Sequence, residues 1–242
     1  MSAGLFDLPA PLLEWLDARL TALVPSAVSI AFWAAVTGIL SLELYRVVSP
    51  QQRIERLKRD AQAAQRRLSV YDGELQGAWR LIGDLLSLSF RRVAAVLPAT
   101  LVGAYPVVAV LIWTSNGYGH RFPAPGEAVP VEAPAPFEGR WLAEGSAETP
   151  RVQLRRTGDD LVLEVPLSAP VPVLHKRKWW NWLIANPAGY LPSDAPVDEI
   201  DIDLPRRQVI GAGPAWVRGW EAVFLPVLFI AALAWKSARQ IH

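Results

Sequence analysis

Three long apolar stretches alternate with polar segments along this chain. They cover residues 24–48, 93–113 and 220–235, and the middle one carries no charge. A helix needs about 20 residues to cross the hydrocarbon core of a bilayer, so the shorter third stretch must recruit residues that precede it. The pattern predicts transmembrane helices at residues 24–48, 93–113 and 215–236.

The segment between the first two apolar stretches, residues 49–92, has a heptad pattern. Its apolar or small residues follow steps of three and four, the spacing of a coiled-coil or hairpin seam. These positions are Ile54, Leu57, Ala61, Ala64, Leu68, Tyr71, Leu75, Ala78, Ile82 and Leu85. The only turn signal is Asp72-Gly73, so the segment is either one long helix or an antiparallel hairpin of residues 50–71 against 74–91. We favour the hairpin, because the second apolar stretch must return to the membrane near the first.

Charge is distributed unevenly between the polar segments. Residues 46–92 carry ten Lys/Arg against five Asp/Glu, whereas residues 114–219 carry eleven against thirteen. Loops that are rich in Lys and Arg stay on the cytoplasmic side of a membrane. We therefore expect a bacterial inner-membrane protein with residues 49–92 and 237–242 in the cytoplasm and with the N-terminus and residues 114–214 outside. The formal net charge is only +1, so no nucleic-acid partner is expected.

The first 23 residues are expected outside the membrane core. Residues 10–23 follow a helical period, with five leucines on one side and Glu14, Asp17 and Arg19 elsewhere. The pattern predicts an amphipathic helix on the outer leaflet. The alternative is an extension of the first transmembrane helix with a kink at Pro25.

A small, mostly antiparallel β domain is predicted within the periplasmic residues 114–214. Residues 114–149 are rich in Pro, Gly, Ala and Glu and are expected to form an extended linker. A hairpin turn is expected at residues 157–160. The strand candidates are residues 130–131, 137–142, 152–154, 161–165, 171–174, 200–204 and 208–210.

Residues 175–191 combine cations with aromatic rings, a mixture that is typical of a membrane–water interface. The functional interpretation is a platform that holds the β domain against the outer leaflet or a partner, and the alternative is ordinary domain core and rim. The platform residues are Lys176, Arg177, Lys178, Trp179, Trp180 and Trp182.

The residues that usually carry covalent or metal chemistry are scarce. The chain has no cysteine and three histidines, none spaced for a shared metal site. The acidic residues Asp198, Glu199, Asp201 and Asp203 alternate with apolar ones, which predicts an edge strand with an acidic face rather than a calcium loop. No enzyme, metal or cofactor is therefore expected.

The order of these segments resembles the YidC/Oxa/Get-type membrane insertase superfamily. The resemblance is to its small three-span branch, which includes archaeal YidC-like proteins and subunits of the eukaryotic ER insertase. It covers residues 24–113 and 215–242, and the basic coiled coil opens with the sequence Ser-Pro-Gln-Gln-Arg-Ile-Glu-Arg-Leu-Lys at residues 49–58. A β domain between the second and third spans is not a usual feature of this branch.

The resemblance implies an insertase-like or chaperone function without covalent chemistry. A polar groove in the membrane would accept part of a client membrane protein, and the hairpin would capture clients or contact the ribosome. The implied groove residues are Thr37, Ser41, Glu43, Thr100 and Tyr105, and those at the cytosolic mouth are Arg46, Arg91 and Arg92. The alternative is a non-catalytic subunit of a larger membrane complex that docks through the hairpin and the Trp-rich platform.

Overall fold

A computed structural model describes residues 4–143, 149–156 and 160–239 of the chain. The chain divides into two compact units. Unit 1 comprises Met1–Ala34 and Val108–Val227, and unit 2 comprises Ala35–Val107 and Leu228–His242. Unit 1 contains the β structure and the N-terminal helix, and unit 2 contains a helical hairpin.

Among the described residues, three helices are long and apolar enough to cross a membrane, so the chain has the composition of a membrane protein. They are α2 (Ser26–Val48), α4 (Leu75–Tyr118) and α5 (Glu221–Arg239). The third differs from the predicted span of residues 215–236 at both ends. Gly213 adopts a left-handed φ of 99°, and Ala215–Val217 form a separate 3₁₀ helix, η3. The helix therefore starts at Glu221 and reaches span length at its C-terminal end.

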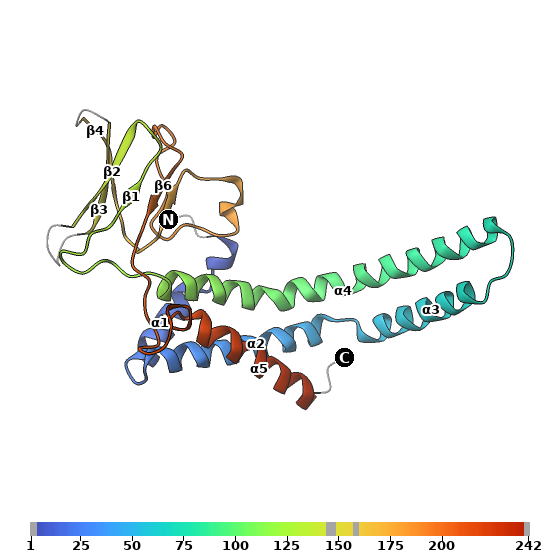
Figure 1. Cartoon of the computed structure of the whole chain (residues 1–242). Helices are drawn as coiled ribbons and strands as arrows, with labels where there is room; N and C mark the ends of the chain where they lie inside the picture. The colour runs from blue at the N-terminus through green and yellow to red at the C-terminus, as the bar shows by residue number, and fades with distance from the viewer. Residues whose placement is uncertain (1–3, 144–148, 157–159, 240–242) are drawn as a thin grey trace. The chain divides into compact units, whose positions relative to one another are not determined.

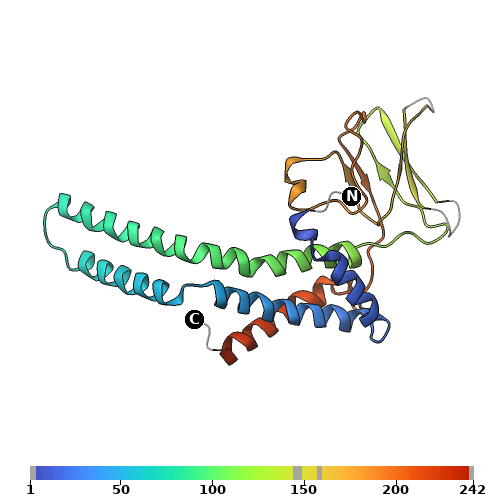
Figure 2. The ribbon, with the colours of Figure 1, turned by 180° about the vertical axis from the view of Figure 1, so that it is seen from behind.

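Unit 2 contains the predicted helix–turn–helix. Helix α3 (Gln51–Ser69) and the first part of α4 run side by side in opposite directions, joined by a short turn that contains Asp72 and Gly73 (Figures 1 and 2). The predicted seam faces the partner helix over most of its length, and Ala64 is only 5% exposed. At the tip, the predicted seam residues Tyr71 and Leu75 are instead exposed. Apolar contact therefore holds the arms together below the tip.

The hairpin and the second span were expected to be separate elements, but helix α4 runs through both of them. Its 44 residues continue without a break through Pro98 and Pro106. At 1.5 Å per residue the helix is about 66 Å long, roughly twice the thickness of a bilayer's hydrocarbon core. One helix thus supplies both an arm of the hairpin and an apolar segment of span length.

Small residues bring the helices of unit 2 into close contact. A Cβ atom on Gly38 of α2 would lie 2.9 Å from the carbonyl oxygen of Leu228 in α5, so only glycine permits this approach. On α4, the Gly103 carbonyl accepts a hydrogen bond of 2.6 Å from Ser41 Oγ. Both contacts are typical of helix packing in membranes, where small residues let backbones approach.

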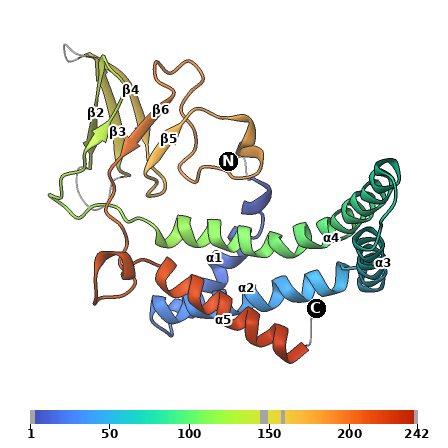
Figure 3. The same ribbon diagram turned by 45° about the vertical axis from the view of Figure 1, so that its right-hand side comes forward.

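The β region of unit 1 consists of two three-stranded sheets, visible in Figures 1 and 3. One has the order β1-β6-β5 and the other β2-β3-β4, and every pair of neighbouring strands is antiparallel. A single apolar cluster includes Leu154, Leu174 and Ile200, each at most 1% exposed. The strands are β1 (Val131–Glu132), β2 (Phe137–Leu142), β3 (Arg151–Arg156), β4 (Leu161–Pro166), β5 (Val173–His175) and β6 (Glu199–Ile202).

Two details of the β region differ from the sequence-based expectation. Strands β1 and β2 lie close to their predicted ranges, residues 130–131 and 137–142, but residues 208–210 form no strand. Strand β6 is central rather than at an edge, because β1 and β5 pair with its two sides. Its alternation is as expected, since Ile200 and Ile202 are buried and Asp201 is exposed. Most of the predicted hairpin turn, residues 157–159, lies outside the described residues.

The N-terminal segment forms a 3₁₀ helix, η1 (Leu5–Asp7), and the helix α1 (Ala10–Thr21). Leu12, Trp15 and Leu16 are exposed on α1, as expected for an amphipathic helix that offers an apolar surface. Leu13 and Asp17 face the interior of unit 1 instead. The buried carboxylate of Asp17 is the unexpected feature of this helix.

Candidate functional site

The residues predicted to form a groove do not converge on one cavity. Thr37 is only 2% exposed, and Ser41 uses its hydroxyl to bond the Gly103 carbonyl. Thr100 is exposed, and its hydroxyl donates to the Val96 carbonyl of its own helix at 3.1 Å. Thr37 and Ser41 therefore serve helix packing, while Thr100 faces outward.

Glu43 is held by partners from two helices. Its Oε2 atom lies 2.7 Å from Arg46 Nη2, one turn further along α2. Its Oε1 atom accepts a hydrogen bond of 2.7 Å from the indole of Trp235 in α5, and the Arg239 guanidinium lies 3.6 Å away. A carboxylate on an apolar helix needs such partners, because an unpaired charge is costly in hydrocarbon. The contribution of α5 to this pairing has no counterpart in the sequence-based expectation.

A cavity of about 470 Å³ opens where the hairpin meets the apolar part of α4. It brings together Thr100, expected in the groove, and Arg92, expected at the mouth. The walls combine Ala61 of α3 with Ser89, Val93 and Leu97 of α4. The cavity thus offers hydroxyl groups and one guanidinium on an otherwise apolar surface. Arg46, Arg91 and Tyr105 do not line it.

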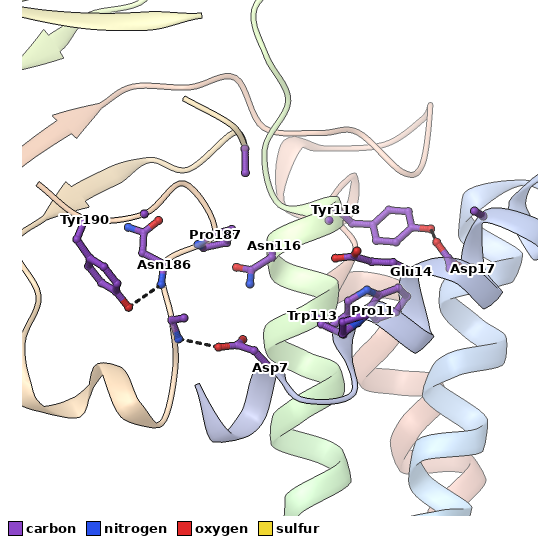
Figure 4. Close-up of a pocket in the computed structure, with 16 residues that line it drawn as sticks. Asp7, Pro11, Glu14, Asp17, Trp113, Asn116, Tyr118, Asn186, Pro187 and Tyr190 are labelled. Carbon is purple, nitrogen blue, oxygen red and sulfur yellow. Dashed lines mark hydrogen bonds between the residues drawn. The ribbon is translucent and has the colours of Figure 1, made fainter. Parts of the chain in front are cut away.

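A second site lies in unit 1 around the carboxylate of Asp17. Tyr118, at the end of α4, donates its hydroxyl to Asp17 Oδ2 at 2.5 Å. Oδ1 accepts hydrogen bonds from the Trp33 indole at 3.0 Å and from the Ser29 hydroxyl, both on α2. Three donors from two helices thus saturate one carboxylate of α1, as expected for a buried charge. Figure 4 shows the Tyr118 ring directed toward Asp17.

Aromatic packing reinforces this cluster. Trp113 makes edge contacts with Trp33 and Tyr118, at ring-centroid distances of 5.7 and 6.3 Å. The Arg207 guanidinium stacks 4.7 Å from the centre of the Tyr118 ring and donates to the Gly117 carbonyl. Asp17 was expected away from the five leucines, but it falls four residues after Leu13 and three before Leu20 and therefore lies on the same helix face. An acid that interrupts an apolar face is a candidate for a buried, bonded role.

A cavity of about 520 Å³ adjoins the Asp17 cluster (Figure 4). Its walls come from η1, α1, the end of α4 and the loop at residues 185–190. Among the hydrogen bonds that order this loop, Ala185 N–H donates to Asp7 Oδ2 at 2.7 Å, and Asn186 N–H donates to the Tyr190 hydroxyl at 3.2 Å. The N-terminal segment is thereby fixed to the β region.

The structure divides the predicted platform into exposed rings and paired cations. Trp179 and Trp182, on the 3₁₀ helix η2 (Trp179–Trp182), are 81% and 56% exposed, whereas Trp180 packs on the His175 ring at 5.4 Å. Among the basic residues Arg177 and Lys178 are exposed. Lys176 bonds Asp198 at 2.9 Å, and Lys178 bonds Glu199 at 3.1 Å. The platform therefore presents two indole rings to its surroundings and pairs two of its three cations internally.

Within the described part of the chain, no group of three or more His, Cys, Asp or Glu side chains could hold a metal ion. Burial lowers the pKa of His120, the second residue after α4, and the charge of Arg206 lowers it further. Comparison with protein-family models, curated proteins and solved structures finds no match to this chain.

Proposed function

We propose that this protein is an insertase-like membrane chaperone that binds a client segment in the cavity at the base of its hairpin. The observation that carries the proposal is the meeting of Thr100, Arg92 and apolar side chains in that cavity. The proposal assigns the protein to the YidC/Oxa/Get-type superfamily because the order of its segments resembles that of the superfamily. The cavity takes the role that the predicted groove would have had.

The cavity can accept a segment that is partly polar and partly apolar. Moving a charged group into hydrocarbon costs several kcal/mol, and hydroxyl groups or an opposite charge reduce that cost. Arg92 can bind a carboxylate or backbone carbonyl of the client, while Val93 and Leu97 contact its apolar side chains. No covalent step is needed, because the protein only has to lower the free energy of the client at the membrane surface.

Filling the cavity with a large side chain tests this proposal. We expect Thr100→Trp to reduce the insertion of a single-span client by fivefold or more, because the indole would occupy the space that the client needs. The measurement is protease protection of the client in proteoliposomes that contain the purified protein.

The matched control is Leu101→Trp. Leu101 is the next residue of α4, is 63% exposed and does not line the cavity, so the same side chain there should leave insertion within about twofold of wild type. Equal activity of the two variants would exclude the cavity as the client site. An inactive wild type in the same assay would refute the insertase proposal itself.

The orientation of the chain is a separate part of the proposal. Because the chain has no cysteine, single cysteines can report the side of the membrane on which a residue lies. We expect Gln62→Cys in α3 to react with a membrane-impermeant maleimide only after cell lysis, and Glu132→Cys in β1 to react in cells with a permeable outer membrane. The reverse pattern would show that the charge rule misassigns this protein.

A second candidate function is that of a structural subunit in a larger membrane complex. It is favoured by the burial of Thr37 and by the Ser41–Gly103 hydrogen bond, which leave the predicted groove filled by the chain's own helices. The exposed Trp179 and Trp182 would then contact the partner. A photo-crosslinker at Trp182 that captures one stoichiometric membrane protein, with none captured from Thr100, would favour this function.

A further inference from the structure

The cavity beside Asp17 has the size of a ligand site but is not used by the proposed function. Its volume of about 520 Å³ falls within the range of about 300–1,000 Å³ that is usual for small-molecule sites. Its walls come from three regions that are distant in sequence: the N-terminal η1 and α1, the end of α4, and residues 169 and 185–190. The site is therefore built by tertiary structure, and it lies entirely within unit 1.

The charges that line this cavity are all negative. Asp7, Glu14 and Asp17 contribute carboxylates, and no Lys, Arg or His lines it. Two of the carboxylates are already occupied, because Asp7 accepts backbone N–H groups and Asp17 accepts three side-chain donors. Glu14 has no hydrogen bond or ion pair within the described residues, and its side chain is exposed. One carboxylate is thus available to a ligand, and a ligand with a negative charge is disfavoured.

The other residues that line the cavity favour an organic cation over a metal ion. The three carboxylates do not converge into a group that could hold a metal ion among the described residues. Most of the other lining is apolar or aromatic, including Trp113, Tyr118 and Pro187. Organic ammonium groups bind between carboxylates and aromatic rings, because the ring face is negative and a carboxylate accepts the N–H donors of the ammonium. The cavity is also far larger than an ammonium group, so it has room for an apolar body.

We propose that the cavity between α1, the end of α4 and the loop at residues 185–190 binds an amphipathic organic ammonium, with Glu14 as its counter-ion. The apolar body would lie against Trp113 and Pro187, and Asn116 would face the polar end (Figure 4). Two sources carry this ammonium chemistry: the head group of phosphatidylethanolamine, whose phosphate would have to lie outside the acidic cavity, and a soluble alkylamine. Either would join the N-terminal segment to the β region by filling the space between them.

Binding to the purified full-length protein tests the proposal. In detergent, n-butylammonium chloride is titrated by calorimetry, with n-butanol as the uncharged analogue. In nanodiscs of phosphatidylglycerol with or without phosphatidylethanolamine, native mass spectrometry counts the lipid that stays bound. We expect saturable binding of the ammonium probe, of phosphatidylethanolamine, or of both, and none of butanol.

Two variants locate the site. Glu14→Gln should weaken binding at least tenfold, whereas Glu132→Gln, which removes the same charge from an exposed residue of β1 outside the cavity, should leave it unchanged. If Glu14→Gln loses binding only in the calorimetric experiment, the ligand is a soluble amine. If it loses binding only in the nanodiscs, the ligand is the lipid. The proposal is wrong if neither probe binds, if butanol binds equally well, or if Glu14→Gln binds like wild type. Because Glu14 is exposed, its replacement should not disturb folding.

Discussion

Replacement of Asp17 by alanine will destabilise unit 1 by about 3 kcal/mol or more. The substitution leaves three donors without their acceptor, and each is buried: Ser29, Trp33 and Tyr118 are 0%, 7% and 3% exposed. A buried donor that loses its partner costs about 1–3 kcal/mol. The loss should appear as a lower midpoint of chemical unfolding, followed by near-ultraviolet circular dichroism, to which Trp33 and Trp113 contribute.

The comparison variant is Glu14→Ala on the same helix. It removes a carboxylate that has no partner within the described residues and is exposed, so its effect should stay within about 0.5 kcal/mol. A third variant, Asp17→Asn, keeps the shape and one acceptor oxygen and should fall between the two. Equal unfolding midpoints for Asp17→Ala and Glu14→Ala would mean that the three hydrogen bonds do not stabilise unit 1.

The elements that sequence reasoning predicted well are those that local periodicity determines. The heptad spacing from Ile54 to Leu85 and the Asp72-Gly73 turn specify two helices and the side on which they meet. Strand β2 coincides with its predicted range of residues 137–142, because alternation and flanking turn residues act over a few positions. Such signals lie within the element that they describe.

The features that were missed depend on which elements meet in space. Nothing near β6 reveals that β1, about 70 residues earlier, pairs with its free side and makes it a central strand. The partners of Asp17 are likewise remote, since Tyr118 lies 101 residues away. The sequence also does not show whether a polar residue in an apolar helix is buried. Thr37 and Thr100 both lie in apolar stretches, but Thr37 is buried and Thr100 lines a cavity. Only the tertiary contacts show which of these polar residues pack between helices and which line a cavity.

The relation between the two sites follows from their positions in the chain. The cavity with Thr100 and Arg92 belongs to unit 2, and the cavity with Glu14 and Asp17 belongs to unit 1. Helix α4 contributes to both, at residues 89–100 and 113–118, so one continuous helix carries two chemically different surfaces. One surface is cationic and the other anionic. The client and the ammonium ligand would therefore be selected by opposite charges.

Replacement of Leu154 by alanine should have the second large effect, a loss of about 3 kcal/mol in the stability of the β region. Leu154 is 0% exposed on β3, the central strand of its sheet, and belongs to the apolar cluster of both sheets. Truncation of a buried leucine typically costs about 2–5 kcal/mol, through lost burial and the cavity left behind. The expected readout is hydrogen exchange of the β3 amides, which should accelerate about 100-fold where exchange requires unfolding of the domain.

Two comparisons determine whether this loss is local. Leu161→Ala on the neighbouring strand β4 removes the same side chain where it is 53% exposed, and it should change exchange by less than about threefold. The amides of α3, which belongs to unit 2, should exchange at their wild-type rates in Leu154→Ala. If the α3 amides accelerated as much as those of β3, the two units would unfold together. In that case the hairpin cavity would depend on the core of the β region, and insertion should fall in Leu154→Ala as it does in Thr100→Trp.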